Sequence, residues 1–189
     1  GAVEVGGQDH EVVDGGDANS VPGDTERSHQ YIHDKVADVL GAGAIPIIIG
    51  GDHSITLPCA TAVAEKHGFG EVGLLHFDAH ADTAPNNFGV LVSHATPMRR
   101  LIESGAVPAK NFVQVGMRGY WPSQSVWRWM REQGLRTHLM AEIVQDGFEV
   151  VLERALAEAL DGPKKLYISV DIDVLDPGFA PGTGTPEPG

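Results

Sequence analysis

Short apolar runs rich in β-branched residues alternate with amphipathic stretches along this chain. This rhythm is typical of βαβ units, in which parallel strands are covered by helices on both faces. It therefore predicts an α/β fold built on a parallel sheet. The expected strands lie at residues 12–13, 45–49, 72–77, 112–116, 135–139 and 166–172.

Helical periodicity between these runs predicts helices over residues 25–40, 58–67, 96–103, 123–133 and 148–160. The first of them has both ends explained, because Asp24 is a suitable N-cap and Gly41 follows its last apolar residue. No repeat, heptad pattern or low-complexity segment interrupts the alternation, so residues 1–189 are expected to form one domain.

The net charge of −13, with Lys and Arg scattered, argues against nucleic acid or an anionic membrane as a partner, because both require a clustered basic surface. No apolar run approaches the ~18 residues that span a bilayer, and the first residues do not resemble a signal peptide. We therefore expect a cytoplasmic protein whose ligand is cationic. Residues 176–189 are loop-like and leave the sheet without a closing strand and helix, so the chain is expected to be cut short.

Acidic and imidazole side chains gather where three of the predicted strands end. The segments are Gly-Gly-Asp-His-Ser at 50–54, His-Phe-Asp-Ala-His-Ala-Asp at 76–82 and Ser-Val-Asp-Ile-Asp at 169–173. In open parallel sheets, ligands bind in the crevice at the carboxyl ends of the strands. Because side chains alternate along a strand, two of these segments can project several ligands to one side. Those residues are Asp78, His80, Asp82, Asp171 and Asp173.

Such a group of carboxylates is unfavourable on its own. Neighbours on one side of a strand lie ~6.5–7 Å apart, and at an effective dielectric constant of about 20 each pair repels by roughly 2–3 kcal/mol. Burial also removes the hydration of the charges. A multivalent cation would offset both costs, so the sequence predicts a metal site.

Four carboxylates and two imidazoles are too many for a tetrahedral zinc site, and a mainly oxygen ligand set suits a harder ion of higher coordination number. We therefore expect two Mn²⁺ ions per chain, which four aspartates would neutralise. The expected bridging ligands are Asp78 and Asp171, the further ligands of one ion are His53 and Asp82, and those of the other are His80 and Asp173. A water shared by the ions, with its pKa lowered by them, is the expected nucleophile.

The other polar residues of these segments are given structural roles. Asp52 is interpreted as a turn residue or a partner of a ligand, and His76 as a core histidine in preference to a partner of a ligand. The histidines expected to be solvated or to cap helices are His10, His29, His33, His67 and His138.

These motifs resemble those of the ureohydrolase family, which includes arginase, agmatinase, guanidinobutyrase and proclavaminate amidinohydrolase. The matching stretches are residues 50–54, 77–83 and 169–189, with further likeness to the agmatinase branch at 93–99 and 115–119. The resemblance implies a dinuclear manganese site in an arginase-like, three-layer α/β/α fold with a mainly parallel, doubly wound sheet. It also implies a trimer or hexamer, and it implies that His94 shuttles a proton to the departing amine.

The resemblance also implies the reaction, hydrolysis of a linear guanidino compound to urea and an amine. Arginases proper usually carry isoleucine and serine where this chain has Thr83 and Val90, which disfavours arginine as the substrate. Residues 101–107 and 118–122 are similar to the branch of agmatinase and proclavaminate amidinohydrolase. Agmatine, cleaved to putrescine, is the first expectation and a guanidino acid the second. The family's guanidinium-binding glutamate is expected to lie outside the chain, and Glu187 is not assigned that role.

Three alternatives stay open. A zinc deacetylase of the same fold would hold a single metal through an Asp-x-His pair and one further Asp, and would not use His53, Asp82 and Asp173. Dinuclear phosphoesterases use mixed Asp and His ligands, but their usual Asn-His-Glu segment is absent here. The third alternative is an inactive fragment that binds metal.

Overall fold

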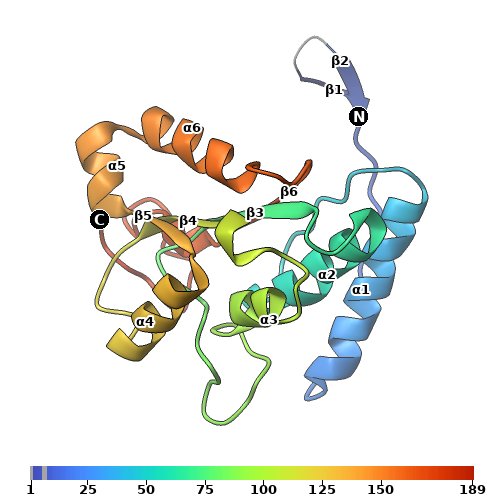
Figure 1. Cartoon of the computed structure of the whole chain (residues 1–189). Helices are drawn as coiled ribbons and strands as arrows, with labels where there is room; N and C mark the ends of the chain where they lie inside the picture. The colour runs from blue at the N-terminus through green and yellow to red at the C-terminus, as the bar shows by residue number, and fades with distance from the viewer. Residues whose placement is uncertain (1, 6–7) are drawn as a thin grey trace.

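The computed structural model describes residues 2–5 and 8–189, with side chains from residue 11 onward. Its main sheet has four parallel strands in the order β5-β4-β3-β6 (Figure 1). These strands are β3 (Val72–Phe77), β4 (Phe112–Met117), β5 (Arg136–Leu139) and β6 (Lys165–Val170). A separate antiparallel hairpin pairs β1 (Ala2–Val5) with β2 (Gln8–Glu11). The main sheet is therefore parallel, as predicted.

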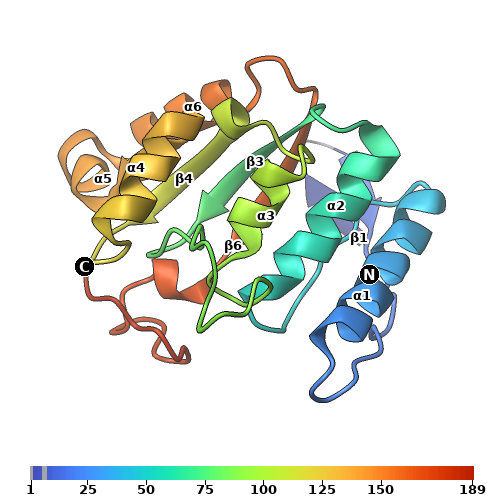
Figure 2. The ribbon, with the colours of Figure 1, turned by 60° about the horizontal axis from the view of Figure 1, so that its bottom comes forward.

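Helices cover both faces of this sheet and make a three-layer α/β/α molecule (Figures 1 and 2). One face carries α2 (Thr56–His67), α3 (Pro97–Glu103) and α4 (Gln124–Gln133), and α1 (Thr25–Gly41) packs against α2. The other face carries α5 (Met140–Asp146) and α6 (Phe148–Ala159). Among the described helices, none has both the length and the apolar character needed to cross a bilayer.

The core consists of an apolar layer on each side of the sheet. Leu74 and Phe112 face the larger layer beneath α2 and α3, whereas Leu75 and Val113 face α6. Neighbouring strand residues thus point to opposite faces, and all four are at most 1% exposed. Because β3 and β4 are covered on both sides, they form near-continuous apolar runs, which is why the sequence predicts them well.

Close contact between the layers depends on Gly73 in β3. A Cβ atom at this position would lie 2.0 Å from the carbonyl oxygen of Ala159 at the end of α6. Only glycine allows the helix to approach the strand this closely.

Strand pairing brings the carboxyl ends of β3 and β6 together. Phe77 is paired with Val170, and the amide of Asp171 donates to the carbonyl of Phe77 at 2.9 Å. The amide of Asp78 donates in turn to the carbonyl of Val115 on β4 at 3.2 Å. The backbone alone therefore places the residues that follow β3 and β6 side by side.

Two predicted strands are wrong. Residues 12–13 follow β2 as coil, and residues 45–49 are coil in which Ile45 and Ile49 are 87% and 93% exposed. An apolar run becomes a strand only where a neighbour satisfies its backbone groups, and no described strand pairs with residues 45–49. Helix α5 is not predicted from the sequence, because it has no buried residue to create an apolar period.

Candidate metal centre

The six predicted metal ligands form one connected cluster at the carboxyl edge of the sheet. Asp78, His80 and Asp82 follow β3, Asp171 and Asp173 follow β6, and His53 begins the short 3₁₀ helix His53–Ile55 before α2. Three segments that are distant in the sequence thus meet at one place.

The Nδ1 atom of His53 faces three carboxylates. It lies 3.0 Å from Asp78 Oδ2, 3.0 Å from Asp82 Oδ2 and 3.1 Å from Asp171 Oδ2. None of these contacts has hydrogen-bond geometry, so Nδ1 is a buried polar atom without a hydrogen-bond partner. The ring is fixed from its other side, where Nε2 lies 2.7 Å from Ser169 Oγ. Nδ1 therefore faces a point that it shares with three carboxylate oxygens.

His80 forms the second half of the cluster. Its Nδ1 lies 3.0 Å from Asp173 Oδ2 and 3.5 Å from Asp78 Oδ1. Asp173 Oδ2 also accepts a hydrogen bond from Thr185 Oγ1 at 2.9 Å, and Asp173 Oδ1 accepts one from the amide of Ala79 at 3.2 Å. Asp78 therefore belongs to both halves, with one carboxylate oxygen facing each.

Burial and charge oppose each other throughout this cluster. Burial disfavours the charged form of His53, but the adjacent carboxylates outweigh it and raise its pKa to about 12. The neighbouring carboxylates of Asp173 and Asp78 raise the pKa of His80 to about 10, because they stabilise the protonated ring. Burial also opposes ionisation of Asp78, yet contacts with the neighbouring imidazoles hold its pKa well below the usual value. At Asp82 burial dominates and raises the pKa of the carboxyl group.

The residues present fit a divalent cation. Ligand atoms bound at about 2.1 Å and at right angles around one ion lie about 3 Å from each other, and the three carboxylate oxygens lie 3.0–3.1 Å from His53 Nδ1. A cation would also replace the protons that the two imidazoles otherwise hold between the carboxylates. Mixed nitrogen and oxygen donors in this number suit an ion of coordination number above four.

Two buried polar residues behind the cluster are not assigned to it by the sequence analysis. His76 is fully buried, which confirms it as a core histidine, and its Nε2 also lies 2.7 Å from Asp78 Oδ2. Gln114 on β4 lies 2.8 Å from the carbonyl oxygen of Ala81 and 3.3 Å from His76 Nδ1. The signal for Gln114 in the sequence is a single amide side chain within the apolar run of β4. A buried amide needs hydrogen-bond partners, so such a residue indicates a polar contact inside the core.

The turn residues around the cluster also have defined roles. Asp82 has a φ of +49°, in the left-handed region that Asp and Asn tolerate better than most residues. Its carbonyl accepts a hydrogen bond from the amide of Met98 at 3.2 Å. Asp52 precedes the 3₁₀ helix, and its side chain accepts from the amide of Ser54 at 2.8 Å, which confirms it as a turn residue.

Arg118 holds the loop after β6 beside the cluster. Its guanidinium donates to five backbone carbonyl groups, those of Gly116, Asp173, Val174, Glu187 and Pro188. Within this loop, Glu187 Oε1 lies 3.7 Å from His80 Nε2. No local pattern in the sequence predicts this role of Arg118, because the carbonyl groups belong to positions far along the chain.

His94 lies on the loop between Asp82 and α3. Hydrogen bonds close the base of this loop, from the amide of Ala84 to the carbonyl of Ala95 at 3.0 Å and from Met98 to Asp82. His94 itself is exposed, and its ring has no hydrogen bond or ion pair within the described part of the chain. Among the described residues, His94 therefore has no hydrogen bond or ion pair to any of the six predicted ligands.

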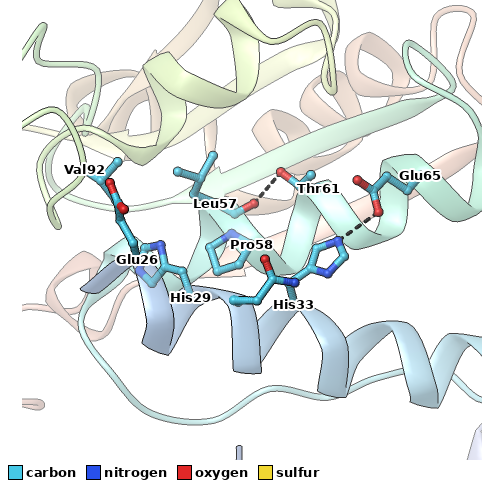
Figure 3. A pocket seen from close by; sticks show the side chains of 9 residues that line it. Glu26, His29, His33, Leu57, Pro58, Thr61, Glu65 and Val92 are labelled. Atoms are coloured by element: carbon cyan, nitrogen blue, oxygen red, sulfur yellow. Dashed lines mark hydrogen bonds and ion pairs between the residues drawn. The ribbon is translucent and has the colours of Figure 1, made fainter. Parts of the chain in front are cut away.

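His29, His33 and His138 have partners outside the six predicted ligands. A groove of 460 Å³ between α1 and α2 is lined by His29 and His33, among others, and by none of the six predicted ligands (Figure 3). His138 is buried, with Glu142 and Glu158 each 3.0 Å from one of its ring nitrogens, so the expectation of a solvated or capping role is wrong. It links β5 to α5 and α6 instead. The side chain of His10 lies outside the described residues.

The fold and the cluster together define an α/β protein with a candidate divalent-metal centre at the carboxyl ends of its parallel strands. The family model described as the arginase family matches residues 2–189. The chain belongs to the arginase family.

Individual relatives support the same assignment. Human mitochondrial guanidino acid hydrolase is 40% identical over 176 residues, which cover 93% of this chain and 49% of the human protein. Mitochondrial agmatinase of Gallus gallus is 39% identical over 176 residues, covering 93% of this chain and 51% of that protein. The solved structure of proclavaminate amidinohydrolase from Streptomyces clavuligerus has a TM-score of 0.80 at 36% identity, covering 91% of this chain and 56% of that one. The chain thus spans about half the length of the curated relatives it matches.

Proposed function

We propose that the protein hydrolyses a linear guanidino compound to urea and an amine with the help of two Mn²⁺ ions held by the six-residue cluster. The observation that carries this proposal is His53 Nδ1, a buried nitrogen without a hydrogen-bond partner that faces three carboxylates. Such an arrangement is unfavourable unless a cation or protons compensate the charge. The solved structure of formiminoglutamase from Trypanosoma cruzi, 28% identical to this chain, contains Mn²⁺, which supports the choice of metal.

The six residues would bind the two ions as follows. His53 and Asp82 would bind one ion, His80 and Asp173 the other, and Asp78 and Asp171 would bind both. Ser169 holds the ring of His53 from behind, and Thr185 holds Asp173. Bound divalent ions lower the pKa of a coordinated water and stabilise the negative charge that develops when it attacks.

His94 is proposed to give a proton to the departing amine. An imidazole can accept and donate a proton near neutral pH, which suits this task. The loop that carries His94 begins at Asp82 and is tied to it through Met98, so the ring belongs to a segment anchored at the cluster.

Agmatine is our first choice of substrate, with putrescine as the product. The relatives are named agmatinase, guanidino acid hydrolase, guanidinobutyrase and guanidinopropionase, so their names support a linear guanidino compound without selecting one. Thr83 and Val90 replace residues usual in arginases and disfavour arginine. A guanidino acid is the second choice. We also propose a trimer or hexamer, and a cytoplasmic location despite the mitochondrial names of several relatives.

Urea release by the full-length protein tests this proposal. With Mn²⁺ added, we expect the highest kcat/KM on agmatine, lower values on guanidinobutyrate and guanidinopropionate, and the lowest on arginine. Equal turnover of arginine would overturn the choice of substrate, and no urea from any guanidino compound would favour an inactive metal-binding protein. A metal count of one per chain would favour the deacetylase alternative.

A variant at the proposed bridging position tests the role of the cluster. Asp171→Ala should abolish nearly all urea release, because both ions lose a ligand. Asp161→Ala, which removes an exposed carboxylate outside the cluster, is the matched control and should retain activity. Equal activity of the two variants would contradict the mechanism.

A further inference from the structure

Gln114 lies outside every metal-binding motif, yet it is hydrogen-bonded into the support of Asp78. It is paired with His76 across β4 and β3, and both side chains are fully buried. A buried amide and a buried imidazole both require hydrogen-bond partners. Three successive hydrogen-bond contacts, from Ala81 through Gln114 and His76 to Asp78, fix the orientation of these side chains.

The first step fixes the amide of Gln114. Its Nε2 lies 2.8 Å from the backbone carbonyl of Ala81, and its Oε1 lies 3.3 Å from Thr137 Oγ1. A backbone carbonyl can only accept a hydrogen bond, so the NH₂ group of Gln114 must be on the side of Ala81. The hydroxyl of Thr137 can then donate to Oε1.

The second step fixes the tautomer of His76. The same NH₂ group lies 3.3 Å from His76 Nδ1. Because this group is a donor only, Nδ1 must accept and therefore carries no hydrogen. A neutral imidazole then carries its hydrogen on Nε2.

The third step fixes the carboxylate of Asp78. The Nε2–H group of His76 donates to Asp78 Oδ2 at 2.7 Å, while the amide of His80 donates to Asp78 Oδ1 at 2.6 Å. Both oxygens are thus held by donors in fixed positions, and rotation of the carboxylate would break two hydrogen bonds. His76 lies close enough to His53, Asp78 and Asp82 to be a metal ligand, but a nitrogen that carries hydrogen cannot bind a metal.

We propose that Gln114 is a positioning residue, which sets the tautomer of His76 and thereby orients the carboxylate that the two metal ions share. This inference rests on the proposed function, because it concerns the same metal site. His76 transmits the effect through its hydrogen bond to Asp78 and is not itself a ligand.

The tautomer is tested in the metal-free, full-length protein by ¹⁵N nuclear magnetic resonance of the His76 ring. Wild type should show Nε2 protonated and Nδ1 bare, and Gln114→Leu should show loss of this single tautomer. A wild-type ring with its hydrogen on Nδ1 would overturn the proposal. This measurement requires neither metal nor activity, and if Gln114→Leu does not fold, the wild-type tautomer alone decides.

Mn²⁺ titration tests the consequence for the site. Gln114→Leu should bind Mn²⁺ about 10–100-fold more weakly, as is usual when a partner of a metal ligand is removed. Val113→Ala, one position earlier on β4 and facing the opposite layer, should lower the melting temperature but change Mn²⁺ affinity less than twofold. An affinity within twofold of wild type in Gln114→Leu, or an equal loss in Val113→Ala, would overturn the proposal.

A double-mutant cycle tests whether Gln114 acts through His76. Because the two residues belong to one chain of contacts, His76→Phe combined with Gln114→Leu should weaken Mn²⁺ binding no more than His76→Phe alone. Additive losses would contradict the proposal, and complete loss of one ion in His76→Phe would show that His76 is a ligand. Failure of wild type to bind Mn²⁺ would refute the proposed function, whereas the tautomer measurement would still decide the role of Gln114.

Discussion

At the scale of single residues, the site depends on carboxylates held where burial disfavours their charge. Asp82 shows this most directly, because burial raises the pKa of its carboxyl group and its backbone has a φ of +49°. Asn tolerates the same backbone conformation and carries no charge. Asp82→Asn therefore separates the electrostatic role of the residue from its structural role.

Metal-free Asp82→Asn should melt at a higher temperature than metal-free wild type at pH 7. A carboxyl group whose pKa is raised in the folded state lowers stability at pH values above its unfolded pKa, and the amide removes this effect. The same variant should bind Mn²⁺ more than about 100-fold more weakly, since a ligand contributes more than the residues that support it. Thermal melts with and without Mn²⁺ measure both effects. A lower melting temperature of the metal-free variant would show that the carboxylate stabilises the fold without metal.

The pKa values of the two cluster histidines predict how metal binding depends on pH. Burial lowers the pKa of His53, but the neighbouring carboxylates outweigh it and raise this pKa to about 12. The carboxylates also raise the pKa of His80 to about 10. Both rings therefore hold a proton at neutral pH in the metal-free protein, and each must lose it to bind an ion. Mn²⁺ affinity should rise about tenfold per pH unit for each proton displaced. Calorimetry between pH 6 and 8 in buffers of different ionisation enthalpy measures the release, and an affinity independent of pH would contradict it.

Asp and His recur at strand ends in three motifs, and this recurrence predicts the set of ligands. No such motif marks Gln114 or Arg118, and none shows that His76 contacts Asp78. The role of Gln114 depends on its pairing with His76 across two strands, and that of Arg118 on carbonyl groups up to 70 positions away. Such contacts follow from the register and the path of the chain, which no local pattern in the sequence contains.

At the scale of elements, the close approach of β3 and α6 is the contact most sensitive to side-chain size. Gly73→Ala would place a Cβ atom 2.0 Å from the carbonyl oxygen of Ala159. We expect it to lower the free energy of unfolding by about 3 kcal/mol, the upper part of the usual range for overpacking. Gly41→Ala is the matched control, because a Cβ atom at Gly41 would meet no other atom within 4 Å and α1 ends there. It should raise the free energy by about 0.5–1 kcal/mol, and equal effects in urea unfolding would refute the close contact.

The elements that the sequence predicts are those whose burial creates a clear period. Four strands of the main sheet and five helices lie where the periodicity places them, within a few residues. Residues 45–49 have the composition of a buried strand but are coil, since pairing depends on a partner and not on composition. Helix α5 is the converse case, a real element that the sequence pattern does not reveal. It has no buried residues and therefore no apolar stripe to recognise.

At the scale of the whole molecule, the three layers serve to bring three motifs to one edge of the sheet. β6 is an edge strand on which Ile168 and Val170 are 56% and 64% exposed. The six predicted ligands nevertheless come together within the described residues, because β3 and β6 are direct neighbours and α2 begins beside them.

The central claim is that six side chains from three segments bind a pair of divalent ions. The most direct measurement is an anomalous difference map from a crystal of the protein grown with Mn²⁺, recorded near the manganese absorption edge. The account predicts two peaks, one contacted by His53 and Asp82, the other by His80 and Asp173, and both by Asp78 and Asp171. No peak at this position, a single peak, or peaks bound by other residues would contradict it.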